Sequence, residues 1–134
     1  MGDEKYLKKL VQLPNVIYCG YLAYEDYLKL YDKVSICLSL RNPNCEENKY
    51  NFPSKILEYF LYGKIVISTI EYPEISTFNY YKIDYDVEEL IKVILSIRVN
   101  YKQRRFIDNR EQLEKIVSDK SWEKCIKIIE KNND

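Results

Sequence analysis

The order of apolar and polar positions along the chain predicts helices that alternate with short strands. Apolar residues recur at helical spacing in four segments, residues 3–13, 24–32, 53–62 and 86–99. Short apolar runs lie between them at residues 16–20, 34–39 and 64–68, with a weaker run at 79–83 and a turn or short helix at 72–75. The tail, residues 104–131, is predicted to form two more helices that meet near 118–121, the last docked by Trp122, Ile126 and Ile129.

Strands that alternate with helices at this spacing form a parallel sheet with helices on both faces. We therefore expect an α/β protein with a Rossmann-like, three-layer α/β/α architecture, a mostly parallel sheet and C-terminal helices. Residues 79–83 should form its edge strand, and Asp86 should cap the helix that follows. Residues 1–134 supply enough apolar sequence for a single domain with one core.

The segment 51–69 carries the clearest local signals. Pro is favoured at the first helical position and Gly just past the end of a helix, so Pro53 and Gly63 bound a helix over 53–62. A β-branched run over 64–68 then predicts a strand. One stripe of the helix is apolar and consists of Ile56, Leu57, Phe60 and Leu61. Polar side chains lie off that stripe near the helix start, where a helix favours an anion; they are Ser54, Lys55 and Glu58.

In parallel sheets, ligands bind beyond the carboxyl ends of the strands, where loops meet helix N-termini. Three parts of the chain are expected to meet there. Gly20 and Tyr21 follow the first predicted strand, a polar loop without periodicity over 41–51 follows the second, and the helix over 53–62 begins after that loop. This convergence is geometric and names no ligand by itself.

Composition excludes several classes of function. Lys plus Arg equals Asp plus Glu at 21 each, so no bulk charge favours nucleic acid or an anionic membrane. The chain has no His, which removes the commonest general base and metal ligand and the Ser-His and Cys-His arrangements. No apolar run approaches the roughly 20 residues of a membrane span, and we recognise no signal peptide.

The four cysteines show no Cys-x-x-Cys spacing. Cys19 and Cys37 fall in predicted buried strands, while Cys45 and Cys125 do not. We interpret all four as reduced thiols in a cytoplasmic protein rather than as disulfides.

Three stretches of the chain follow a known family pattern. Residues 15–21, Asn-Val-Ile-Tyr-Cys-Gly-Tyr, fit a strand and turn, and residues 24–39 fit the next helix and strand. Residues 53–68 contain Pro-Ser-Lys-x-x-Glu and, after Glu58, Gly-Lys-Ile-Val-Ile at the expected spacing. Together they resemble the C-terminal, nucleotide-sugar-binding domain of two-domain B-fold glycosyltransferases, particularly glycosyltransferase family 4. The resemblance covers about residues 2–94.

The resemblance implies roles for individual residues. Glu58 would accept hydrogen bonds from the ribose hydroxyls, which agrees with a carboxylate having only acceptors. The amides around Ser54 and Lys55 would face the diphosphate, with the Lys55 ammonium as a second contact. Gly20 and Tyr21 would lie against the base. A further candidate for nucleotide binding, through its amide, is Asn51, although a loop Asn is also a common turn former.

The activity implied is that of a retaining glycosyltransferase of the hexosyltransferase type, in polysaccharide biosynthesis, that moves a sugar from a nucleotide diphosphate donor to a glycan or lipid-linked acceptor. Neither a metal nor another cofactor is required. Tyr50 stands where many members carry a Glu associated with the donor sugar. The family's basic diphosphate residues, first strand and acceptor domain match no part of the chain. We therefore expect a fragment without catalytic residues, inactive alone, from a cytoplasmic enzyme with a possible peripheral contact at the inner face of the membrane.

Simpler interpretations stay open for each site residue. Glu58 can be a solvated helix carboxylate paired with Lys55 or Tyr62, and Lys55 an ordinary surface lysine. Gly20 can simply end a strand, and Tyr21 can belong to the core.

Other interpretations concern the chain beyond these residues. Glu46 and Glu47 could suggest a metal pair, but adjacent loop residues rarely converge on one ion. The basic residues over 101–110 fit a solvated helix face or a patch for anionic membranes. The alternative function is a non-catalytic α/β protein-interaction module that ignores nucleotides.

Overall fold

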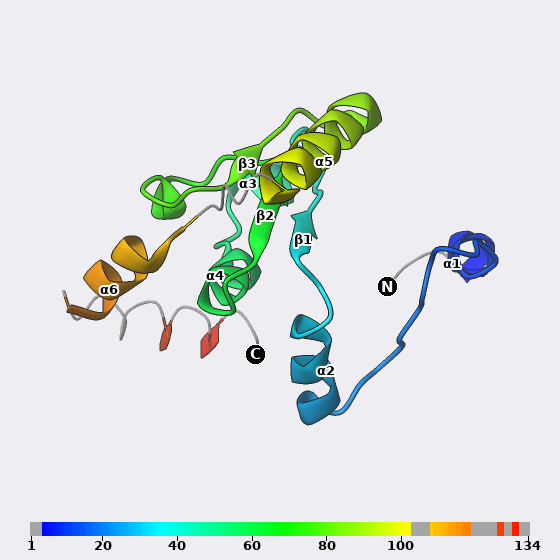
Figure 1. Ribbon diagram of the computed structural model, residues 1–134, viewed down its shortest axis with the longest axis horizontal. Helices are drawn as coiled ribbons and strands as arrows, with labels where there is room; N and C mark the ends of the chain where they lie inside the picture. The colour runs from blue at the N-terminus through cyan, green and yellow to red at the C-terminus, as the bar shows by residue number, and fades with distance from the viewer. Residues whose placement is uncertain (1–3, 103–107, 119–125, 128–129, 132–134) are drawn as a thin grey trace. The chain divides into compact units, whose positions relative to one another are not determined.

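The computed structural model describes residues 4–102, 108–118, 126–127 and 130–131 (Figure 1). The chain forms two compact units, Met1–Lys33 and Val34–Asp134, and each is described by itself. None of the described helices is long and apolar enough to cross a membrane.

The N-terminal unit contains two helices, α1 (Glu4–Leu10) and α2 (Tyr24–Tyr31). Both were predicted from helical spacing, and α1 ends three residues before the predicted boundary. In α2 the rings of Tyr27 and Tyr31 pack edge to face with centroids 5.5 Å apart, and their hydroxyls lie 2.9 Å from each other. This i, i+4 contact stabilises the short helix locally.

The strand predicted over 16–20 is wrong. These residues have no regular secondary structure, and the side chain of Ile17 is 88% exposed. The thiol of Cys19, expected inside that strand, is also exposed. A strand needs a neighbour that completes its backbone hydrogen bonds, and in the described residues the sheet contains only later segments. An apolar run therefore exists here without the pairing that would make it a strand.

The C-terminal unit is built on a parallel sheet in the order β1 (Ile36–Ser39), β2 (Ile65–Ser68), β3 (Tyr81–Lys82). Ile36 lies opposite Ile65, and Ile67 lies opposite Tyr81. These are the strands predicted over 34–39, 64–68 and 79–83, each shortened, and β3 is at the edge as expected. The α/β fold class with a parallel sheet is confirmed.

Helices α4 (Ser54–Leu61) and α5 (Val87–Lys102) cover opposite faces of this sheet (Figure 1). Successive side chains of a strand point to opposite faces, and β2 shows the result. Val66 packs with the α4 side chains Ile56, Leu57 and Phe60, whereas Ile67 packs with Ile97 of α5. The unit therefore has the expected α/β/α layers, with a core on each side of β2.

Two predictions about α4, one on its start and one on its apolar stripe, need small corrections. Pro53 is the residue before the helix rather than its first residue, and Leu61 is 46% exposed although it was expected in the apolar stripe. Gly63 has a φ of 69°, which confirms its predicted role after the helix end. The short helix η1 (Pro73–Ile75) confirms the turn predicted over 72–75.

The loop predicted over 41–51 contains one helical turn, α3 (Glu46–Lys49). A four-residue helix is shorter than the window in which apolar periodicity is visible. The prediction of an irregular loop is therefore wrong over these residues.

The C-terminal part of the unit begins with α5. The Asp86 carboxylate accepts a hydrogen bond from the Glu89 amide at 3.2 Å, which confirms Asp86 as the cap. Helix α6 (Arg110–Ser118) confirms a helix in the tail, and Leu113 and Ile116 pack against the core on the α4 side. Trp122 and Ile129 lie outside the described residues, as does Cys125.

Candidate functional site

The candidate site lies at the carboxyl edge of the sheet in the C-terminal unit. Helix α4 ends at Leu61 and β2 starts at Ile65, so this tight connection makes the helix run back along the sheet, against the direction of β2. Its N-terminus therefore lies toward the carboxyl ends of β1 and β2, where Ser39 and Ser68 are register partners. This is the edge at which parallel sheets bind ligands.

Thr69 fixes the chain as it leaves β1. Its hydroxyl accepts a hydrogen bond from the Arg41 amide at 2.8 Å and donates to the Arg41 carbonyl. The Thr69 side chain is buried, so these bonds are shielded from water. They hold the first residues after β1 against the end of β2, on the edge that the α4 N-terminus faces.

The α4 N-terminus has no side-chain cap from Pro53, the residue that precedes the helix. Pro53 has no N–H of its own, and the Ser54 amide donates to the Phe52 carbonyl at 2.9 Å. The helix dipole adds partial positive charge at this end of α4. This end of α4 can therefore bind an anion.

Lys55 and Glu58 form an ion pair, with Nζ 3.0 Å from Oε2. The Lys55 side chain is 59% exposed, but that of Glu58 is only 26% exposed. The pairing that we considered as the simpler interpretation of Glu58 is therefore present. The low exposure of the carboxylate departs from that interpretation, which had it solvated.

Burial raises the pKa of the Cys37 thiol on β1, the Lys64 ammonium lowers it, and the Glu58 carboxylate raises it further. Cys37 is the register partner of Val66, in the middle of the sheet. Glu58 itself lies one helical turn after Ser54 on α4.

Asn51 and Tyr50 are both exposed in the connection between α3 and α4. Asn51 precedes the helix by three residues, close in sequence to Ser54. The structure therefore places Asn51, Ser54, Lys55 and Glu58 along one stretch at the start of α4.

Gly20 and Tyr21 belong to the N-terminal unit, and the α4 residues belong to the C-terminal unit. Tyr21 is fully exposed, and the interpretation of this residue as core is wrong. Gly20 has a φ of 62°, a conformation that favours glycine, but no strand precedes it. The geometric reason for expecting these two residues at the carboxyl edge of the sheet is therefore lost.

Arg41 was not among the predicted site residues. It is exposed at the carboxyl end of β1. Burial raises the pKa of Tyr72, and the Arg41 guanidinium opposes that rise. A cation two residues past a predicted strand is the signal that would have pointed to it. Thr69, at the end of β2, could have been found in the same way.

The described residues contain no group of three or more His, Cys, Asp or Glu side chains that could hold a metal ion. Glu46 and Glu47 are exposed neighbours on α3, and adjacent residues of a helix point in different directions. Cys19, Cys37 and Cys45 are free thiols.

Comparison of the chain with family models, curated proteins and solved structures finds no match. The resemblance to glycosyltransferase family 4 therefore stays a prediction from the motifs over residues 15–39 and 53–68.

Proposed function

We propose that the C-terminal unit binds the nucleoside diphosphate of a sugar nucleotide and is the donor-binding part of a retaining glycosyltransferase. The observation that carries this proposal is the placement of Glu58. Its side chain is only 26% exposed, and it lies one turn from the N-terminus of α4, the helix end that lies toward the carboxyl edge of a parallel sheet.

The chemistry of these groups divides the ligand into two parts. An ionised carboxylate offers only acceptors, and two oxygens fit the vicinal hydroxyls of a ribose. The α4 N-terminus around Ser54 and Lys55, the Lys55 ammonium and Arg41 provide the positive charge that suits a diphosphate. In the free protein the Lys55 ammonium pairs with the Glu58 carboxylate. When the ligand binds, the carboxylate contacts the ribose instead and the ammonium contacts a phosphate. The Lys55 side chain is 59% exposed, so water can solvate its ammonium when the pair separates.

Departure of the diphosphate builds negative charge on its oxygens. A helix N-terminus and nearby cations stabilise that charge without a metal ion. No residue of this chain is proposed as catalytic. In the full-length enzyme, which we place in the cytoplasm with a peripheral membrane contact, another domain supplies the glycan or lipid-linked acceptor.

Amide chemical shifts test the binding proposal directly. Titration of the chain with uridine, guanosine or adenosine diphosphate to millimolar concentration should move the amide signals of Ser54, Lys55 and Glu58. Shifts at Gly20 and Tyr21 would support their predicted contact with the base. Unmoved signals over Ser54 to Glu58 with all three nucleotides would contradict the proposal.

Glu58→Ala tests the residue that carries the proposal. Loss of a charge-assisted acceptor should weaken nucleoside diphosphate binding by about 1.5–3 kcal/mol, or about ten- to a hundredfold. Glu114→Ala, which removes an exposed carboxylate from α6, is the matched control and should leave the affinity unchanged. Equal affinity of the Glu58 variant and the wild type would return Glu58 to a surface carboxylate paired with Lys55.

The second candidate function is a non-catalytic α/β interaction module. The observation that favours it is the exposed apolar surface of α5, where Ile91, Leu95 and Val99 are each more than half exposed. Contiguous exposed apolar side chains mark protein-binding surfaces. A chain that ignores all nucleotides in the titration but associates through α5 would have this function instead.

A further inference from the structure

Helix α5 has two apolar faces, and the sheet covers only one of them. Leu90, Val93 and Ile97 pack against β2 and its neighbours. A second set of apolar side chains is between 36% and 70% exposed; it consists of Val87, Ile91, Ile94, Leu95 and Val99. Their spacing of three and four residues places them along one stripe of the helix, which we call the outer stripe.

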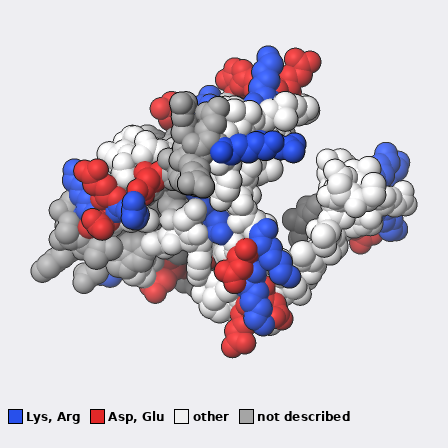
Figure 2. Space-filling model, in the orientation of Figure 1, with Lys and Arg blue, Asp and Glu red and all other residues white. Residues whose placement is uncertain are grey.

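The charged residues near the two ends of the outer stripe differ in sign. Glu88 is near its beginning, and Arg98 and Lys102 are near its end. Figure 2 shows acidic side chains, with a basic side chain between them, over the beginning of α5 and basic side chains over its end. No carboxylate of the described residues pairs with Arg98 or Lys102. The stripe therefore begins near an acidic residue and ends near basic residues, with apolar side chains between them, and the exposed Lys92 flanks its first half.

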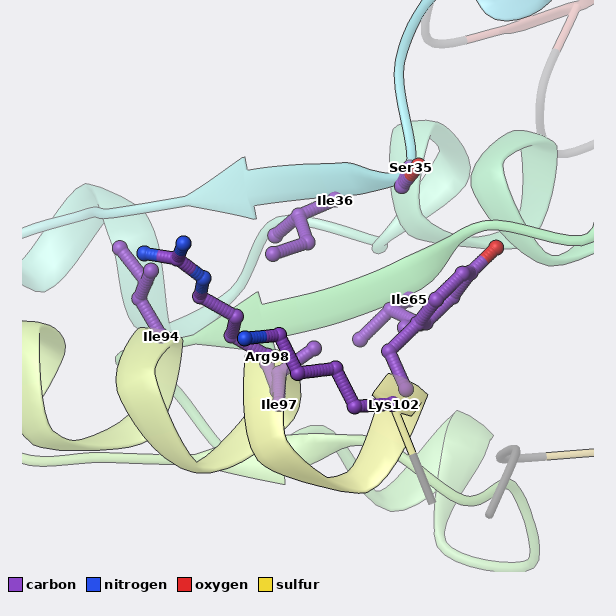
Figure 3. Close-up of a pocket in the computed structure, with 8 residues that line it drawn as sticks. Ser35, Ile36, Ile65, Ile94, Ile97, Arg98 and Lys102 are labelled. Carbon is purple, nitrogen blue, oxygen red and sulfur yellow. The ribbon is translucent and has the colours of Figure 1, made fainter. Parts of the chain in front are cut away.

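An apolar groove continues the outer stripe toward the sheet. It lies between the second half of α5 and β1, has a volume of about 260 Å³, and is walled by Ile36, Ile65, Ile94 and Ile97. Arg98 and Lys102 lie along its rim (Figure 3). β1 is an edge strand of the described sheet, so this side of the groove has no further strand within the described residues. The groove can accept aliphatic side chains from outside.

We propose that this face binds a second copy of the chain, with the two α5 helices antiparallel. In that arrangement Glu88 of each copy lies opposite Lys102 and Arg98 of the other, and the apolar stripes meet in the middle. A parallel arrangement would place like charges together. Two-fold symmetry makes every contact occur twice, which is the usual form of a homodimer interface.

The antiparallel arrangement also uses the groove. Apolar side chains of the outer stripe of one copy enter the groove of the other, beside Arg98 and Lys102. One helix with an adjoining groove is a small interface, so the dimer should be weak and reversible. This inference depends on exposure and charge order and does not rest on nucleotide binding.

Sedimentation velocity over micromolar to millimolar concentrations, with amide shifts recorded in parallel, measures the association. Concentration-dependent shifts should be confined to α5 and the groove wall. Leu95→Asp places a charge in the apolar centre and should raise the dissociation constant at least about tenfold. Ser96→Asp adds the same charge at the neighbouring exposed position, which points away from the outer stripe, and should leave it unchanged.

Charge reversal tests the orientation. Glu88→Lys and Lys102→Glu should each raise the dissociation constant about fivefold, because an exposed pair is lost at two symmetric places. The two changes combined should restore association. Thermal unfolding checks that each variant is folded. A chain that is monomeric at every concentration, or a dimer insensitive to Leu95→Asp, overturns the proposal, and failure of the combined variant to recover overturns the antiparallel arrangement.

Discussion

Hydrogen bonds of the Asn109 side chain join the start of α6 to the segment that precedes β3. Asn109 is 9% exposed, and its side chain is paired on both sides with the backbone of Asn79. Its Oδ1 accepts from the Asn79 amide at 2.6 Å, and its Nδ2 donates to the Asn79 carbonyl at 3.0 Å. The Asn79 side chain returns a hydrogen bond to the Asp108 carbonyl at 3.0 Å. Asn109→Ala removes the first two bonds together.

The magnitude follows from these two bonds. Each neutral hydrogen bond contributes about 1 kcal/mol net, and an unpaired buried group costs more than a group that water can reach. Asn79 is itself exposed, so water can reach part of its backbone after the substitution. We expect Asn109→Ala to lower the free energy of unfolding by about 2 kcal/mol, which corresponds to a decrease in Tm of about 6–10 °C at this chain length.

Urea and thermal unfolding followed by circular dichroism measure this loss. Asn109→Asp keeps an acceptor for the Asn79 amide but places a carboxylate against the Asn79 carbonyl, so it should destabilise as well. Arg110→Ala is the control; Arg110 is 84% exposed and pairs with Asp108, and such a pair contributes little. Equal unfolding free energies for Asn109→Ala and Arg110→Ala would refute the reasoning.

Two further predictions concern local backbone and thiol chemistry. Gly63→Ala should lower the free energy of unfolding by about 1–2 kcal/mol, because φ at this position is 69°. An added Cβ would meet no atom within 4 Å, so the whole effect comes from backbone strain. Urea unfolding measures the loss, and an unchanged midpoint contradicts the prediction. Iodoacetamide should alkylate the exposed Cys19 before Cys37, and the rate at Cys37 should rise only at higher pH, because burial raises the pKa of its thiol and the thiolate is the reactive form. Peptide mass spectrometry measures the labelling of each cysteine. Faster labelling of Cys37 than of Cys19 at neutral pH would contradict the prediction.

The predictable parts of the fold are those with local signals. Pro53 and Gly63 bound α4 to within one residue, and Asp86 caps α5 as its position before an apolar helix indicates. These signals act through the backbone of a single turn. Tertiary packing does not alter them, which is why the sequence is sufficient at these places.

The parts that failed depend on partners distant in sequence. The run over 16–20 has the composition of a buried strand, but a strand forms only where a neighbour accepts and donates its hydrogen bonds. Leu61 has a place in the apolar stripe of α4 and is nevertheless half exposed, because the stripe is wider than the surface that covers it.

The residues of the candidate site also fall into a group with local sequence signals and a group that depends on distant partners. Ser54, Lys55 and Glu58 were predicted together because helical spacing alone brings them together. Arg41 and Thr69 were missed because their contact joins residues 28 positions apart. Such a contact is fixed by the register between β1 and β2, which the apolar pattern does not specify.

For the outer stripe of α5, the order of the charged residues limits the possible partners more than the apolar pattern does. Apolar residues at helical spacing indicate that a surface favours burial, but the same pattern fits a sheet, a lipid surface or another helix. The order of Glu88, Arg98 and Lys102 is more selective, because a uniformly anionic surface would leave Glu88 opposed by like charge. A partner with its own acidic and basic ends in reverse order satisfies all three residues, and an antiparallel copy of α5 has that order. The combined charge reversal therefore tests the one property of this surface that its hydrophobicity leaves open.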